Sequence, residues 1–323
     1  MRSPPGLARR TGTGLLLLVA CWLALSPGSA AGACALSTQT LTFGTINPQS
    51  SATIYTSGTA RVSCTGLQND ANFSVCLAIG PGDAPGSTFA SRTITSGGNK
   101  IPIVIKSSPA ASQEIGTGSR YPQAGPISFM TNSNGDGSVT FPMSIALSGP
   151  LAVPPGTYSN TFIGMNFEAT YVDGIRSECG RSGTKAVGGR LTVQAVVVAG
   201  CSVTASAMNF GSVSILTSAI SATSTISLSC TKGVTASIAL DNGQTGTSPV
   251  SRQLRSGSSA IRYGIYRDSS HIFPWGQTTG SDTVSVQMGA STSATVTAYG
   301  IVPAQGTPVP GNFTDVVMVT ITY

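Results

Sequence analysis

Short stretches of alternating apolar and polar residues recur along the whole chain, and turn-forming residues separate them. Residues 225–228 (TISL), 295–298 (TVTA) and 317–321 (VMVTI) show this period of two. Val, Ile, Thr and Tyr dominate such stretches, Gly, Pro, Asn and Ser lie between them, and no helical period persists. Many short strands joined by frequent turns predict an all-β fold, built as a sandwich rather than as a parallel sheet.

An internal repeat divides this pattern into two similar copies. Residues 34–44 (CALSTQTLTFG) and 201–211 (CSVTASAMNFG) each begin with Cys and carry Phe-Gly at the same offset. A second cysteine follows the first after 30 residues at Cys64 and after 29 residues at Cys230. Self-similarity of this kind indicates two copies of one domain.

Later segments extend the repeat. Residues 74–77 (SVCL) match 237–240 (SIAL), and residues 154–162 (PPGTYSNTF) match 309–317 (VPGNFTDVV). The repeat predicts an N-terminal domain at residues 34–199 and a C-terminal domain at residues 200–323.

The N-terminus has the pattern of a secretory signal peptide over residues 1–33. Arginines at positions 2, 9 and 10 precede a short apolar run at 15–25 (LLLLVACWLAL), and small residues follow Pro27. Such a run is too short to span a bilayer and is typical of a cleaved leader. We expect cleavage between Ala30 and Ala33 and export through the periplasm to the cell surface.

Composition narrows the classes of function. Only 9% of the 323 residues are charged, and the net charge of +6 includes the three arginines of the leader. No Lys/Arg cluster remains after them, so nothing supports nucleic-acid binding. One histidine and singly scattered acids offer no metal site and no carboxylate pair for hydrolysis. We therefore expect that the protein is not an enzyme and binds neither a cofactor nor a metal ion.

Six cysteines remain once Cys21 leaves with the leader, and an even number in an exported chain indicates disulfides. The repeat predicts one bridge in each copy, and the two cysteines without a counterpart would pair with each other. A lipid anchor is the weaker interpretation of residues 31–34 (AGAC), because the leading Leu of a lipobox is missing. The predicted pairs are Cys34–Cys64, Cys201–Cys230 and Cys76–Cys179.

The two copies end differently. Eight residues follow Asp315, whereas forty residues lie between its counterpart Asn160 and Cys201. The extra segment includes another strand-like run, residues 191–198 (LTVQAVVV). The second copy therefore lacks a final strand, which would leave unpaired backbone groups and a slot in its core. We expect it to accept a strand from another chain.

The second copy resembles the spore coat protein U domain family, which includes pilins of archaic (Csu-type) chaperone–usher pili. The resemblance rests on residues 262–266 (RYGIY), 274–276 (PWG), 299–303 (YGIVP) and 311–315 (GNFTD). The first copy matches more weakly, since it lacks the Trp-Gly element and has Asn160 in place of Asp.

The resemblance implies two Ig-like, pilin-type β-sandwich domains, the C-terminal one lacking its final strand, in a two-domain tip adhesin. It implies donor-strand complementation, with a periplasmic pilus chaperone, an outer-membrane usher and an adjacent pilin subunit donating a strand as partners. Since zero to three residues would precede Cys34 after cleavage, the chain has no strand of its own to donate and is expected to end a polymer. The expected strand-binding residues are Val317, Val319, Ile321 and Tyr323.

The resemblance also implies that apolar loops of the N-terminal domain contact abiotic or host surfaces, and we expect surface attachment and biofilm formation to follow from this contact. Exposed apolar groups held by Pro favour hydrophobic contact over sugar recognition, although the same residues could be buried strand ends. The alternatives are a glycan-binding, lectin-like pilus tip and a secreted structural coat or matrix protein. The candidate surface-binding residues are Phe89, Ile127, Phe129, Met130, Leu147, Leu151 and Val153.

Overall fold

The computed structural model describes residues 32–117, 122–180 and 184–323. The predicted leader, apart from Gly32 and Ala33, lies outside these residues. Within them the chain is all-β and forms no helix, as the alternating pattern predicts. No helix in the described part of the chain could cross a lipid bilayer.

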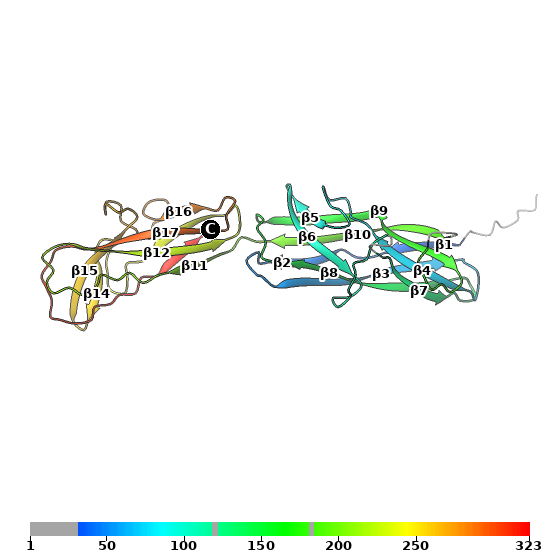
Figure 1. Cartoon of the computed structure of the whole chain (residues 1–323), viewed down its shortest axis with the longest axis horizontal. Helices are drawn as coiled ribbons and strands as arrows, with labels where there is room; N and C mark the ends of the chain where they lie inside the picture. The colour runs from blue at the N-terminus through cyan, green and yellow to red at the C-terminus, as the bar shows by residue number, and fades with distance from the viewer. Residues whose placement is uncertain (1–31, 118–121, 181–183) are drawn as a thin grey trace, which may run out of the picture. The chain divides into compact units, whose positions relative to one another are not determined.

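The N-terminal sandwich comprises the first ten described strands (Figure 1). They are β1 (Ala33–Ser37), β2 (Leu41–Ile46), β3 (Thr53–Thr65), β4 (Asn72–Ile79), β5 (Arg92–Ser96), β6 (Asn99–Lys106), β7 (Ala124–Met130), β8 (Gly137–Ser148), β9 (Gly156–Asp173) and β10 (Lys185–Val197). The strands follow the order β1-β3-β8-β6-β5-β9-β10-β2, and β4 pairs with both β9 and β7. The β5–β6 hairpin connects the two layers, because β6 pairs with β8 and β5 pairs with β9.

The C-terminal sandwich contains the remaining strands. They are β11 (Cys201–Ala205), β12 (Ile220–Cys230), β13 (Thr235–Leu240), β14 (Arg252–Ser256), β15 (Ser259–Tyr266), β16 (Val284–Gln287), β17 (Ser293–Val302) and β18 (Val319–Thr322). A five-stranded sheet has the order β11-β12-β17-β15-β14, and a three-stranded sheet has the order β16-β13-β18. The sequence thus forms two separate hydrophobic cores, one in each sandwich.

Alternation along each strand explains how the cores form. In β12, Ile226 and Leu228 are buried, whereas Thr225 and Ser229 on the other face are exposed. Burying an Ile or Leu side chain contributes about 1.5–3 kcal/mol relative to leaving it exposed. Strand β4 differs, since it is buried almost throughout. The segment after β9 covers its outer face, where the Ser74 hydroxyl donates to the carbonyl of Gly174 at 2.8 Å.

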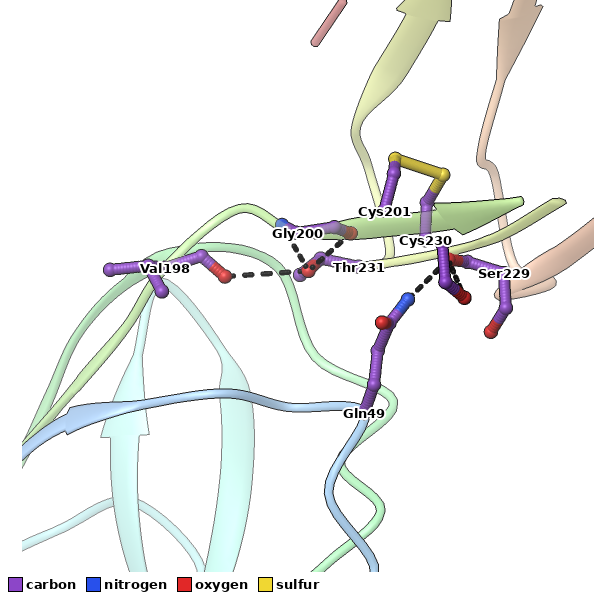
Figure 2. The surroundings of a disulfide bond; sticks show 8 residues. Gln49, Val198, Gly200, Cys201, Ser229, Cys230 and Thr231 are labelled. Atoms are coloured by element: carbon purple, nitrogen blue, oxygen red, sulfur yellow. Dashed lines mark hydrogen bonds between the residues drawn. A yellow bond between two sulfur atoms is a disulfide. The ribbon is translucent and has the colours of Figure 1, made fainter. Parts of the chain in front are cut away.

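Three disulfides join the cysteines as predicted. Cys34 and Cys64 face each other directly in the β1–β3 register, and Cys201 and Cys230 do so in the β11–β12 register. Figure 2 shows the second of these bonds at the start of β11. Beside it, the Thr231 amide donates to the carbonyl of Gly200 at 2.8 Å, which fixes the entry of the chain into this sandwich (Figure 2).

The third disulfide, Cys76–Cys179, spans 103 residues and ties the segment after β9 to β4. In the chain-entropy account, closing a loop of about 100 residues stabilises the folded state by about 4–5 kcal/mol. We expect the Cys76→Ser/Cys179→Ser variant to lose about that much free energy of unfolding of the N-terminal sandwich, measured by denaturant titration. The Cys34→Ser/Cys64→Ser variant is the matched control, since its shorter loop predicts a smaller loss. A loss below about 1 kcal/mol for the Cys76–Cys179 pair would contradict this expectation.

Candidate functional site: an open edge in the C-terminal sandwich

Strand β18 and its counterpart in the N-terminal sandwich, β9, have different neighbours. In the N-terminal sandwich, β9 pairs with β4 on one side and with β10 on the other. In the C-terminal sandwich, β18 pairs with β13 alone, and no described strand covers its second edge. The backbone groups of β18 on that side therefore have no partner strand, as the missing final strand predicts.

Strand β10 shows what occupies the equivalent place in the N-terminal sandwich. It runs antiparallel to β9 and parallel to β2 (Figure 1). Its inward side chains Leu191, Val193, Ala195 and Val197 are all 2% exposed or less. The extra segment of the first copy is thus a strand that fills the core of its own sandwich.

The segment that matches β2 in the C-terminal sandwich forms no strand. Ile46 of β2 is 1% exposed, whereas Val213, at the same offset from the leading cysteine, is 47% exposed. Residues 206–219 contain no strand, whereas β2 forms the parallel ladder with β10. The C-terminal sandwich therefore has two incomplete flanks, the free edge of β18 and residues 206–219, because no described strand lies where β10 lies in the N-terminal sandwich.

A cavity of about 320 Å³ lies between these flanks. Met208 and Phe210 line it from one side, Val317 and Val319 from the other, and Ile226 and Tyr263 from within the sandwich. We call this cavity, together with the free edge of β18, the acceptor groove. Its walls are largely apolar and continuous with the hydrophobic core, which suits the alternate side chains of an added strand.

The predicted strand-binding residues occupy two kinds of position along this edge. Val317, Val319 and Ile321 are partly buried and pack against the core. Tyr323 is 56% exposed, and the intervening Thr320 also faces outward. Val317, Val319 and Ile321 thus lie on the core-facing side, whereas Tyr323 follows the end of β18 and is exposed.

Asp315 is a polar group in the wall of the acceptor groove. One carboxylate oxygen accepts hydrogen bonds from the amides of Gln244 and Val316, and the other accepts one from the Tyr263 hydroxyl at 2.8 Å. Burial, followed by the interaction with Asp315, raises the pKa of Tyr263 above its usual range. The hydroxyl therefore stays protonated and keeps the carboxylate in place.

Two buried arginines, which the sequence pattern did not reveal, hold the chain where β4 and β13 end. Arg252 donates to the carbonyls of Asp241 and Leu240, and Arg92 donates to those of Gly80 and Ile79. Both are 1% exposed or less. A Ser-Arg pair at 91–92 and at 251–252 is the only sequence signal for them.

The arginine contacts also correct the alignment of the repeat. They place Ile79 in the position of Leu240, so residues 76–79 correspond to residues 237–240. The predicted match of 74–77 with 237–240 is wrong by two residues. A shift of two keeps every side chain on the same face of a strand, so alternation alone does not reveal it.

The candidate surface-binding residues do not gather in one place. Leu147, Leu151 and Val153 are 8% exposed or less and belong to the core, near the end of the sandwich where β10 finishes. Buried side chains cannot contact an external surface, so these three residues are no longer candidates for surface binding. Phe89 lies in the β4–β5 loop, beneath the buried Arg92 guanidinium.

The other three candidates lie in strand β7 rather than in a loop. Ile127 and Phe129 are partly buried against the core, and Phe129 stacks on Phe73 with ring centroids 5.8 Å apart. Met130, at the end of β7, is 65% exposed. Ile175, in the segment after β9, is 71% exposed and was not among the candidates.

Met130 and Ile175 mark the same end of the N-terminal sandwich. Met130 pairs with Asn72 at the start of β4, where Phe73 opposes Asp173 at the end of β9. This end lies opposite to Val197, where β10 finishes (Figure 1). Among the described residues, no group of three or more His, Cys, Asp or Glu could hold a metal ion.

A match to a protein-family model shows which family the chain belongs to. The Spore Coat Protein U domain model matches residues 23–164 and again residues 188–320. The chain belongs to this family. The two matches show that the chain contains two copies of this domain, including the weaker first one, and the second match begins within β10. No curated protein sequence matches the chain.

Two solved structures are similar to this family member. One is from the CsuC–CsuE chaperone–tip adhesion subunit pre-assembly complex of the archaic chaperone–usher Csu pili of Acinetobacter baumannii. Identity is 16%, coverage is 90% of this chain and 100% of that chain, and the TM-score is 0.53. Another is the CupB6 tip adhesin of Pseudomonas aeruginosa, with 12% identity, coverage of 90% and 94%, and a TM-score of 0.39. At this identity the first likeness supports the two-domain pilin-type fold.

Proposed function

We propose that this chain is the tip adhesin subunit of an archaic chaperone–usher pilus. The observation that carries the proposal is the acceptor groove: β18 has one free edge, and an apolar cavity takes the place that β10 fills in the N-terminal sandwich. A strand supplied by another chain would complete the ladder and remove the cavity from water. The solved chain with the same fold comes from a chaperone–tip adhesion subunit complex.

The two sandwiches then have separate roles. The C-terminal sandwich binds a periplasmic chaperone through its acceptor groove, passes the outer-membrane usher, and exchanges the chaperone strand for that of the adjacent pilin. The N-terminal sandwich already holds its last strand, so it needs no partner and can stand at the end of the pilus. The proposal includes the domain limits, residues 34–199 for the N-terminal domain and residues 200–323 for the C-terminal domain.

Periplasmic expression with and without the pilus chaperone tests the proposal. We expect a stable one-to-one complex with the chaperone and degradation of the chain in its absence, because a sandwich with an open strand edge and an unfilled apolar cavity is unstable alone. A soluble, stable monomer without any chaperone would overturn the proposal and favour a secreted coat or matrix protein.

Apolar contact at the free end of the N-terminal sandwich is the proposed route of attachment and of biofilm formation. Met130 and Ile175 are large apolar residues exposed at this end. Exposed apolar side chains bind hydrophobic surfaces by the same loss of water contact that drives core packing. The proposed contact therefore includes Met130 but replaces the three buried candidates with Ile175.

We expect the Met130→Asp/Ile175→Asp variant to lose most of its binding to polystyrene, by about tenfold or more, because two apolar contacts are replaced by charges. Retention of protein on the plastic after washing measures the effect. Met165→Asp is the matched control, since Met165 is 83% exposed in β9, away from this end. Equal loss in the control, or unchanged binding of the double variant, would place the contact elsewhere.

A further inference from the structure

The side chains that line the acceptor groove differ in size from those at the same positions in the N-terminal sandwich. The N-terminal sandwich is the suitable comparison, because β10 lies there in the place that is open in the C-terminal sandwich. Hydrogen bonding shows which positions correspond. Three residues after each of the two buried arginines, a bridge joins β5 to β9 and β14 to the segment before β18. The bridged pairs are Thr95–Ser159 and Arg255–Thr314. Val317 of the groove therefore takes the place of Phe162.

Phe162 fills part of the N-terminal core beside β10. It is 0% exposed and lies opposite Leu191 of β10 in the antiparallel register. Val317 is only partly buried, packs against the C-terminal core and lines the cavity of the acceptor groove. Because a valine side chain is much smaller than a phenylalanine ring, the groove has free room at the position that Leu191 occupies in the other sandwich.

The chain does not fill this room with its own side chains, although it does so elsewhere. Gly300 of β17 takes the place of Ile145 of β8, since each pairs with the residue eight positions before the second cysteine of its copy. Met208 and Phe210 cover Gly300 so closely that an added Cβ atom would collide with the sulfur of Met208. The cavity of about 320 Å³ persists beside Val317 even with these two side chains in place. The room at Val317 is thus left for an incoming side chain.

The next inward position of the groove is narrower than its counterpart. Asp315 forms this position, opposite the place that Val193 has in the N-terminal sandwich. Tyr263 takes the place of Ile103, because each pairs in register with the buried arginine of its sandwich. The Tyr263 hydroxyl donates to Asp315 at 2.8 Å, and Tyr263 lines the cavity. A ring therefore replaces a smaller side chain here and takes up room beside Asp315.

We propose that the acceptor groove selects a strand with an aromatic side chain opposite Val317 and a smaller aliphatic side chain two residues later, opposite Asp315. An aromatic ring across from a β-branched residue is a favourable cross-strand pair. It also removes more apolar surface from water than a leucine does. The occupant is the strand of the adjacent pilin, and this preference rests on the proposed function. Strand β10 of a second copy, with Leu191 at the first position, fits less well.

Competition between synthetic peptides tests this preference. The parent peptide comprises residues 189–198 (GRLTVQAVVV). One variant peptide carries Leu191→Phe, and the matched control carries Val193→Phe, which places the same ring two residues further on. The full chain, with its disulfides intact, is refolded with an equimolar excess of all three peptides. Mass spectrometry of the isolated complex then gives the ratio in which the peptides are retained.

We expect the Leu191→Phe peptide to be retained about tenfold over the parent, and the Val193→Phe peptide to be retained less than the parent. Equal retention of the two phenylalanine peptides would overturn the preference and leave strand capture intact. Retention of none of the three peptides would overturn the proposed function as well, because the groove would then accept no strand.

A change in the chain locates the effect at Val317. Val317→Phe restores the side chain of the first copy and is expected to reverse the order, so that the parent peptide is retained over the Leu191→Phe peptide. Thr320→Phe, on the exposed face of β18, is the matched control and is expected to keep the original order. An unchanged order in Val317→Phe, or a reversed order in Thr320→Phe, would overturn the proposal. The competition on the unaltered chain decides the matter if Val317→Phe does not fold.

Discussion

Replacing Val319 with aspartate is expected to abolish capture of a strand by the C-terminal sandwich. Val319 is partly buried and lines the acceptor groove, so an added strand would enclose the new carboxylate among apolar groups. Enclosing an unpaired charge in this way costs about 3 kcal/mol or more, which is roughly a hundredfold loss of affinity. The measurement is the amount of chaperone that co-purifies with the variant from the periplasm.

Thr320→Asp is the matched control for this change. It introduces the same charge one residue away, on the exposed face of β18. The control is expected to co-purify with chaperone at close to the original yield. If both variants lose the chaperone equally, a general effect of charge on folding explains the result, and the groove argument fails.

Replacing Val193 with aspartate is expected to unfold the N-terminal sandwich. Val193 is 0% exposed in β10, opposite Asn160 of β9. Asn160 already uses its side-chain amide to bind the carbonyls of Thr93 and Pro81, so it is committed to other partners. Enclosing an unpaired carboxylate there costs several kcal/mol, a large share of the about 5–15 kcal/mol that stabilise a typical domain.

Thermal unfolding and resistance to protease measure this effect. Gln194→Glu, at the next position of the same strand, is the matched control because its side chain is only partly covered. We expect the control to unfold at nearly the original temperature. An unchanged melting temperature for Val193→Asp would mean that β10 does not complete this core.

The overall architecture was predictable because its signals are local or repeated. Alternation identifies strands, the two cysteine pairs fix the start of each copy, and the unequal lengths after Asn160 and Asp315 predict the missing strand. All three disulfides have the predicted pairing. Each of these inferences needs only spacing along the chain.

The N-terminal surface was less predictable because exposure depends on packing between distant segments. Leu151 and Met130 are both apolar residues beside turns, yet one is 8% exposed and the other 65%. The difference arises because the Leu151 amide donates to the carbonyl of Pro48 at 2.7 Å, a contact across about a hundred residues that holds this segment on the core. The residues next to Leu151 in the sequence do not predict that contact.

The buried arginines were missed for a related reason. Arg92 and Arg252 are charged residues beside turns, which normally indicates a solvated position. Both instead satisfy several backbone carbonyls of loops that close over the end of a strand. The first copy lacks the Trp-Gly element of the second, and only the structure shows that Ile115 stands where Trp275 does, since the carbonyl of each accepts a hydrogen bond from the buried arginine.

The position of β10 has a kinetic consequence. β9 and β10 are joined within one chain, so the N-terminal sandwich gains its last strand in a unimolecular step that does not depend on protein concentration. A tethered segment of this kind acts at an effective concentration in the millimolar range, about 1 mM. On the proposed function, the C-terminal sandwich instead waits for a bimolecular encounter. Dilution would therefore slow completion of the pilus-facing half of the molecule and leave the surface-facing half unaffected.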